Sequence, residues 1–170
     1  MRLSAAWECR IVCIAIIAGA CRQESTSASD PDAGARLSVF VPAEDVTLAR
    51  QSYSGMDARE RLTVQSANEW SGVWSRIHST QSPIPPIVEP DFNTEVALVA
   101  AMGEKPSGGF TITIDSITRH ERGSIVFVTE KSPGESCITP AVLTQAVHAI
   151  RAPRSEGMTW WRERTAVENC

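Results

Sequence analysis

The sequence predicts an α+β domain in which a mainly antiparallel β-sheet, arranged as a meander, carries one amphipathic helix packed on it. Three observations support this class. Residues 96–102 are apolar without alternation, which is typical of a strand covered on both faces. Residues 110–114 alternate apolar and polar side chains, as a half-buried strand does. Residues 66–77 combine a helix cap with an apolar stripe at helical spacing.

Short apolar or alternating runs bounded by turn residues predict the remaining strands. We expect strands, in chain order, over residues 37–41, 46–53, 59–65, 96–102, 110–114, 125–129 and 158–167. Residues 141–152 satisfy two periods. Val142, Ala146 and Ala149 are spaced as on a helix, whereas Val147 and Arg151 alternate with their neighbours as in a strand. The residues therefore leave helix and strand open for this segment.

The predicted helix begins with a capping box. Ser66 is placed to accept from the backbone of Glu69, and Glu69 to reach back. An apolar stripe follows, made by Trp70, Val73, Trp74 and Ile77. The tryptophan pair is compatible with an aromatic ligand platform, but this spacing is far more typical of core packing against a sheet. We expect core packing.

The first twenty residues have the pattern of an export signal. Residues 11–20 are apolar, and ten residues span only about 15 Å as a helix, half of a bilayer core. Ala18-Gly19-Ala20 before Cys21 resembles a lipobox, the cleavage site of bacterial lipoproteins. The same residues also suit ordinary signal peptidase. We expect a signal peptide over residues 1–20 and lipidation of Cys21.

The polar stretch over residues 21–36 is rich in Ser, Thr, Asp and Ala and predicts a disordered tether before a folded domain over residues 37–170. Arg22 stands after Cys21 in place of Asp, which favours the outer membrane of the cell envelope. The alternative is a secreted or periplasmic protein.

Cysteine usage agrees with an oxidising compartment. Cleavage before Cys21 leaves that residue, Cys137 and Cys170, an odd number. If Cys21 is acylated, Cys137 and Cys170 can form one disulfide; the alternatives are two free thiols or an intermolecular bridge. No Cys-x-x-Cys occurs and the histidines stand far apart, so we expect neither a metal site nor a cofactor.

The charge balance argues against nucleic acid as a partner. The formal net charge is −4, and the two lysines, Lys105 and Lys131, lie in no basic run. Binding to DNA or RNA requires clustered Lys and Arg.

One loop is unusual. Residues 103–110 read Gly-Glu-Lys-Pro-Ser-Gly-Gly-Phe, in which glycines permit close backbone approach and Pro106 restricts the backbone. No Lys-Ser/Thr pair follows Gly108, so this is no phosphate loop. The loop either only connects two strands or binds a partner. The candidate partner-binding residues are Lys105, Pro106, Ser107, Gly108, Gly109 and Phe110.

These features together resemble the C-terminal domain of the protease complex subunit PrcB family. The resembling residues are Glu69, Trp70 and Trp74, then Asp91 and Phe92, then the strand leading into residues 103–110. The similarity is strongest over residues 69–129 and looser as far as residue 154. It implies an exported protein or lipoprotein without catalytic residues, which docks on another exported or envelope protein such as a protease. It also favours a strand over residues 145–152.

Three other functions compete with this one. The domain could be a structural envelope lipoprotein with no specific partner. Residues 105–110 also resemble a loop of chagasin-type inhibitors of cysteine peptidases, although the asparagine of that loop is replaced by Lys105. A hydrolase would need a nucleophile and a base together, and Ser107 with His120 and Asp115 lacks a nucleophile-elbow setting. We therefore expect no enzyme activity.

Overall fold

The computed structural model describes residues 38–40 and 46–170. The expected signal peptide over residues 1–20, the lipidated Cys21 and the tether over residues 21–36 lie outside the described residues. Within them, no helix is both long enough and apolar enough to cross a membrane. The described residues all belong to one compact unit.

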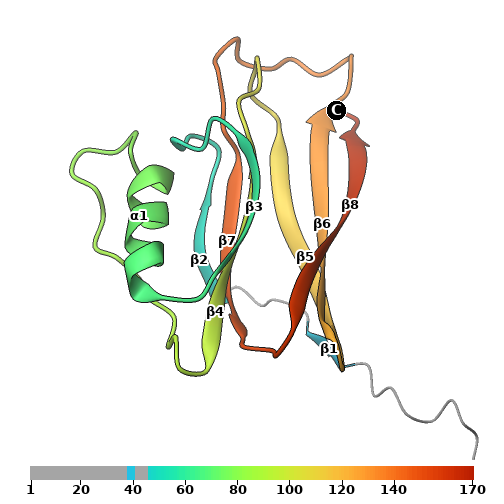
Figure 1. The fold of residues 1–170 in the computed structure, drawn as a ribbon. Helices are drawn as coiled ribbons and strands as arrows, with labels where there is room; N and C mark the ends of the chain where they lie inside the picture. The colour runs from blue at the N-terminus through green and yellow to red at the C-terminus, as the bar shows by residue number, and fades with distance from the viewer. Residues whose placement is uncertain (1–37, 41–45) are drawn as a thin grey trace, which may run out of the picture. The chain divides into compact units, whose positions relative to one another are not determined.

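The fold class is confirmed: the domain is mostly β, with a single α-helix in the described part of the chain (Figure 1). The elements in chain order are β1 Ser38–Phe40, β2 Thr47–Gln51, β3 Arg59–Val64, α1 Ala67–Ile77, β4 Glu95–Met102, β5 Thr111–His120, β6 Gly123–Pro133, β7 Val147–Pro153 and β8 Met158–Glu168.

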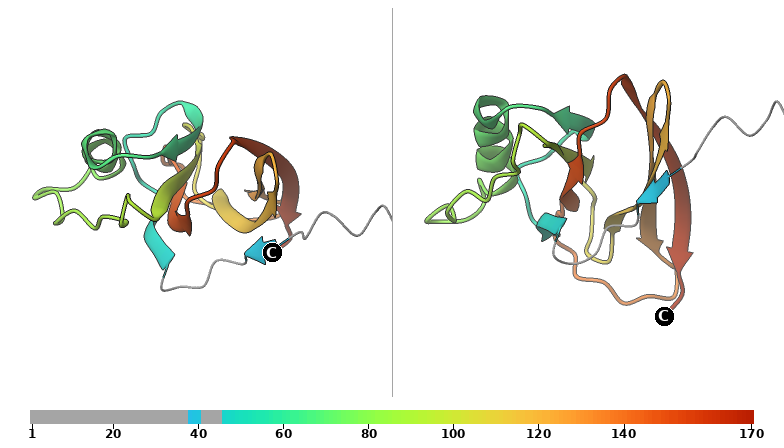
Figure 2. Two further views of the ribbon diagram at one scale, coloured as in Figure 1. Left: turned by 60° about the horizontal axis from the view of Figure 1, so that its bottom comes forward. Right: turned by 90° about the horizontal axis from the view of Figure 1, so that it is seen from below.

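One sheet is antiparallel, with the strand order β2-β7-β4-β3. Its central strand β4 is buried on both faces, as the unbroken apolar run predicts. Ala97, Val99 and Ala101 face α1, while the alternate residues of β4, among them Leu98 and Ala100, face the second sheet. The result is a helix, a sheet and a second sheet in three layers, which both views of Figure 2 show.

The second sheet is mixed. β5 and β6 form an antiparallel hairpin, β8 pairs in parallel with β6, and the short β1 adds to part of the β5 edge. The sheets therefore differ from the single meander that the sequence predicts. β5 and β6 are neighbours, as in a meander, but β4 pairs with β3 and β7 and not with β5. The reason lies in residues 103–110, which carry the chain from one sheet to the other instead of turning it back beside β4.

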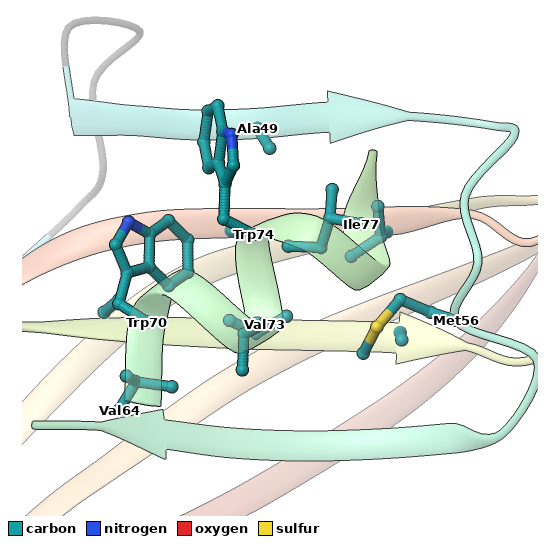
Figure 3. Packing of buried hydrophobic residues seen from close by; sticks show 12 residues of the cluster. Ala49, Met56, Val64, Trp70, Val73, Trp74 and Ile77 are labelled. Atoms are coloured by element: carbon teal, nitrogen blue, oxygen red, sulfur yellow. The ribbon is translucent and has the colours of Figure 1, made fainter. Parts of the chain in front are cut away.

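The helix packs as its stripe predicts. Trp70, Val73, Trp74 and Ile77 are buried against the antiparallel sheet (Figure 3). The indole N–H groups of Trp70 and Trp74 donate to the backbone oxygens of Val88 and Pro85 at 2.8 and 3.1 Å. Core packing is thus confirmed, and the two indoles also hold the connector that follows the helix.

The predicted cap is present with one difference. The Ser66 hydroxyl accepts from the backbone N–H of Glu69 at 3.3 Å. The Glu69 carboxylate reaches back one residue further than a capping box requires, to the N–H of Gln65.

The segment that the residues left open is a strand. Within residues 141–152, β7 begins at Val147, and five of its seven residues are buried. A surface helix would leave one side exposed, whereas β7 lies between β2 and β4 with layers on both faces. The strand that the PrcB resemblance favours is therefore the one observed.

Cys137 and Cys170 form a disulfide, with their Cα atoms 5.3 Å apart. The bond joins the segment after β6 to the chain end after β8. It therefore fixes the start of residues 137–146, which run alongside the unusual loop.

Candidate protein-binding surface

The loop over residues 103–110 is held in shape by its own backbone and by residues 140–144. The N–H of Lys105 donates to the oxygen of Thr144 at 2.8 Å, and the N–H of Thr144 donates back at 3.0 Å. The Thr144 hydroxyl donates to the oxygen of Ser107 at 2.7 Å, and the Gly108 N–H donates to the oxygen of Pro140 at 2.9 Å. The two segments therefore form one unit.

Two glycines of the loop are there for packing and backbone conformation. Gly108 is buried, and a Cβ at this position would lie 2.9 Å from Cδ of Pro140. Gly109 has a φ of +87°, a conformation that favours glycine. Neither glycine can change to a larger residue without disturbing the unit. This explains the Gly-Gly pair without reference to a partner.

The other candidate residues differ in accessibility. Pro106 is exposed, while Lys105, Ser107 and Phe110 are half-buried. Phe110 packs against the core between the sheets, and the ammonium of Lys105 lies 5.9 Å from the centre of its ring. Of the six residues proposed as a partner-binding loop, the structure thus places Pro106 and Gly109 at the surface.

Sequence reasoning missed the apolar residues beside this loop. Ile138, Val142 and Leu143 are exposed by 102, 40 and 53 % in the segment that bonds to the loop. We call Pro106, Ile138, Val142 and Leu143 the loop-end surface. A hollow of about 460 Å³ lined by Gly109, Cys137 and Ile138, among others, adjoins it. In the sequence, these apolar residues lie between Cys137 and β7 in a segment without helix or strand periodicity. That is only a weak sign of exposure.

Asp91 and Phe92, which belong to the PrcB resemblance, form the turn that starts β4. The Asp91 carboxylate accepts from the N–H of Asn93 at 3.1 Å and from the hydroxyl of Thr94 at 2.9 Å. These bonds lower the pKa of Asp91 below its ordinary value, and the bond from the backbone of Asn93 has the largest effect. Arg154 donates to the oxygen of Phe92 at 2.6 Å. The role of the pair here is to position a strand.

The structure does not bring together the residues that a hydrolase would need. Ser107 precedes β5 and His120 ends it, so the ten residues of the strand, roughly 30 Å, separate them. The Asp115 carboxylate accepts a hydrogen bond from the hydroxyl of Thr129 and lies 3.6 Å from the Arg164 guanidinium. Within residues 38–40 and 46–170, no group of three or more His, Cys, Asp or Glu side chains could hold a metal ion.

The fold and its surface describe a small β-sandwich domain with a helix on one side. Residues 96–153 match the family model described as PrcB C-terminal. The match runs from β4 through β7, about a third of the chain; it includes residues 103–110 and leaves out α1 and its tryptophans. No curated protein and no solved structure matched the chain.

Proposed function

We propose that this chain is a non-catalytic accessory subunit of the bacterial cell envelope that binds another exported or envelope protein through the loop-end surface. A protease is one candidate partner, because the family description of the matched residues carries the PrcB name. The proposal includes the lipid anchor at Cys21 and a location at the outer membrane.

One observation carries the proposal. Large apolar side chains are exposed on a segment that is already held in place. The side chains of Ile138 and Leu143 face water. The chain around them is nevertheless fixed, by the disulfide at Cys137 and by the paired backbone of Thr144. An exposed apolar group on a rigid segment binds a partner with little loss of conformational entropy. This is the arrangement that a docking surface requires.

The lack of catalysis is also part of the proposal. It is supported by the separation of Ser107 from His120 along β5. It is also supported by the Asp115 carboxylate, which already accepts a hydrogen bond from Thr129 and pairs with Arg164. Ser107 and His120 are therefore too far apart to act as nucleophile and base.

The test compares two exposed apolar residues. Leu143 on the loop-end surface and Val88 on the connector after α1 are both 53 % exposed. A photo-crosslinker placed at position 143 in cells should trap a partner that the same probe at position 88 does not trap, and mass spectrometry would identify it. With that partner purified, Leu143→Glu should weaken binding about tenfold or more, since it places a charge in an apolar contact. Val88→Glu should leave binding unchanged.

Equal loss from both variants, or no loss from Leu143→Glu, would remove the loop-end surface from the proposal. Both substitutions are at exposed side chains, so unchanged thermal unfolding would show that folding is not the cause. This pair is a cleaner test than substitution of Gly108 or Gly109, because those glycines pack against Pro140 and Pro133.

A further inference from the structure

A second candidate site lies on the face of the mixed sheet that points away from the antiparallel sheet. Val126, Val128 and Trp161 pack into the core between the sheets. Successive side chains of a strand point to opposite faces, so Ile125 and Phe127 of β6 and Trp160 and Arg162 of β8 share the outer face. The register puts Ile125 beside Trp160 and Phe127 beside Arg162. Figure 1 shows β6 and β8 running side by side.

This face is hollowed. One hollow of about 430 Å³ is lined by Ile125, Trp160, Arg162 and the β5–β6 turn at Arg122. Another of about 430 Å³ is lined by Ile125, Phe127 and Arg162 with part of β5. The two share Ile125 and Arg162 as lining residues, so they adjoin each other and are taken together as one groove. We call it the outer groove. Phe127 and Trp160, exposed by 37 and 38 %, supply its aromatic surface.

The groove also holds cationic groups that the fold does not use. Across residues 38–40 and 46–170, Arg122 and Arg162 are the arginine or lysine side chains without a hydrogen bond, ion pair or ring contact, and both line this groove. Asp115 at its far end is paired with Arg164, and Glu163 is paired with Arg59 and Arg61. Glu121 is the remaining carboxylate at the rim. The uncompensated charge of the groove is therefore positive, although the whole chain is acidic.

The spacing favours an extended chain over a small anion. Side chains on one face of a strand repeat every two residues, about 7 Å, and this separates Trp160 from Arg162. An extended peptide presents its own side chains with the same repeat. It can place an apolar residue against Trp160 and Ile125 while its next side chain on that face, an acidic one, meets Arg162. A small anion would use the arginines and leave the aromatic surface uncovered.

We propose that the outer groove binds an extended acidic segment of a partner protein, in which an apolar and an acidic residue stand two positions apart. The site is independent of the loop-end surface. The groove lies near the start of β6, whereas the loop-end surface follows the end of that strand.

The test uses a fluorescein-labelled peptide that repeats Phe-Thr-Glu-Thr, and a matched peptide that repeats Phe-Thr-Lys-Thr. Anisotropy with the purified full chain should show the glutamate peptide binding at least about tenfold more tightly, with an affinity that falls as salt rises. Arg162→Gln should weaken this binding about tenfold, and Trp160→Ser by a similar factor. Arg76→Gln, which removes an exposed arginine on α1, is the control and should change nothing.

Equal affinity for the two peptides, or wild-type affinity in Arg162→Gln, would overturn the proposal. So would binding of polygalacturonate, an acidic polysaccharide, in the absence of peptide binding. Sedimentation as a dimer that Arg162→Gln disrupts, again without peptide binding, would assign the groove to a second copy and also overturn it. Leu143→Glu should leave the peptide affinity unchanged, so the failure of either proposal can be told from that of the other.

Discussion

The Nδ1 atom of His148 in β7 accepts a hydrogen bond of 2.9 Å from the backbone N–H of Ile114 in β5. The bond crosses from one sheet to the other, next to the irregularity in β5 pairing between Ile114 and Ser116. His148 is fully buried. The Nε2 atom of the ring lies 3.5 Å from the Thr47 hydroxyl. The Arg50 guanidinium lies 3.1 Å from the same nitrogen.

His148 makes stability depend on pH. Burial, and then the positive charge of Arg50, lower the pKa of His148 to about 4 from an ordinary value near 6.5. The unfolded chain therefore takes up this proton first as pH falls. The contribution of His148 is complete above about pH 6.5 and is lost between there and about pH 4, by about 3 kcal/mol in the unfolding free energy.

Urea unfolding at a series of pH values measures this loss. His148→Asn keeps an acceptor near the N–H of Ile114 but does not titrate, so its unfolding free energy should change far less across the same window. A slope that His148→Asn leaves intact would contradict this assignment.

The disulfide should contribute measurably to stability. Cys137 and Cys170 close a loop with a sequence separation of 33, for which the chain-entropy estimate is about 3–4 kcal/mol. Replacing both with serine should lower the unfolding free energy by about that amount, as chemical denaturation would show. A reductant should destabilise the wild type and leave the double variant unchanged. Two reactive thiols in the unfolded, unreduced chain would contradict the bond.

A group of four charges closes the sandwich between β3 and the mixed sheet. Arg59 and Arg61 of β3 both contact Glu130 of β6 and Glu163 of β8. The Arg61 and Glu130 side chains are only 10 and 11 % exposed. Hydrogen bonding to Glu163 raises the pKa of Arg59 above its ordinary value, so the arginine stays charged.

Removal of one buried partner should be costly. Arg61→Met leaves Glu130 short of a counter-charge in a largely dry site and should lower the unfolding free energy by about 3 kcal/mol. The double variant Arg61→Met, Glu130→Gln should regain part of the loss, because no buried charge is then left over. The exposed pair between Arg76 and Glu60 is the matched control: Arg76→Met should cost less than about 1 kcal/mol in calorimetry. Equal costs for Arg61→Met and Arg76→Met would refute the argument.

The lipid anchor at Cys21 is tested by fractionation. Cys21→Ala should move the chain from the membrane pellet to the soluble fraction, because a tether without acyl chains has little to hold it at a bilayer. Cys137→Ala should stay in the pellet. Intact mass of the wild type should show cleavage before Cys21 and the added acyl groups. An uncleaved amino terminus on a cytosolic protein would exclude the anchor and the envelope partner with it.

Elements with a strong local pattern could be predicted from the sequence. The cap at Ser66 and the stripe from Trp70 to Ile77 specify α1 through contacts within a few turns of chain. The apolar run of β4 reveals a strand covered on both faces, and the odd cysteine count leads to the bond between Cys137 and Cys170. These inferences need only period, capping chemistry and composition.

The surfaces could not be predicted in the same way. Pro106 and the Gly-Gly pair mark an unusual loop, but nothing local reveals that Gly108 is buried against Pro140. Ile138 and Leu143 lie in a segment without a period, so their exposure depends on what packs beneath them. The outer groove requires Trp160 to lie beside Ile125, residues that are far apart in the chain and meet only through the pairing of β8 with β6.

The amino-acid sequence by itself determined most of the helix and strand segments, although not the state of residues 141–152. It also determined where α1 is capped and that β4 is covered on both faces. Tertiary structure alone decided which strands are neighbours. β4 pairs with β3 and β7 and not with β5, the next strand along the chain, and β8 pairs with β6 in parallel. The physical reason is range. Helix capping and side-chain alternation are set by residues a few positions apart, whereas strand partners are chosen by the burial of both sheets at once, to which distant segments contribute together.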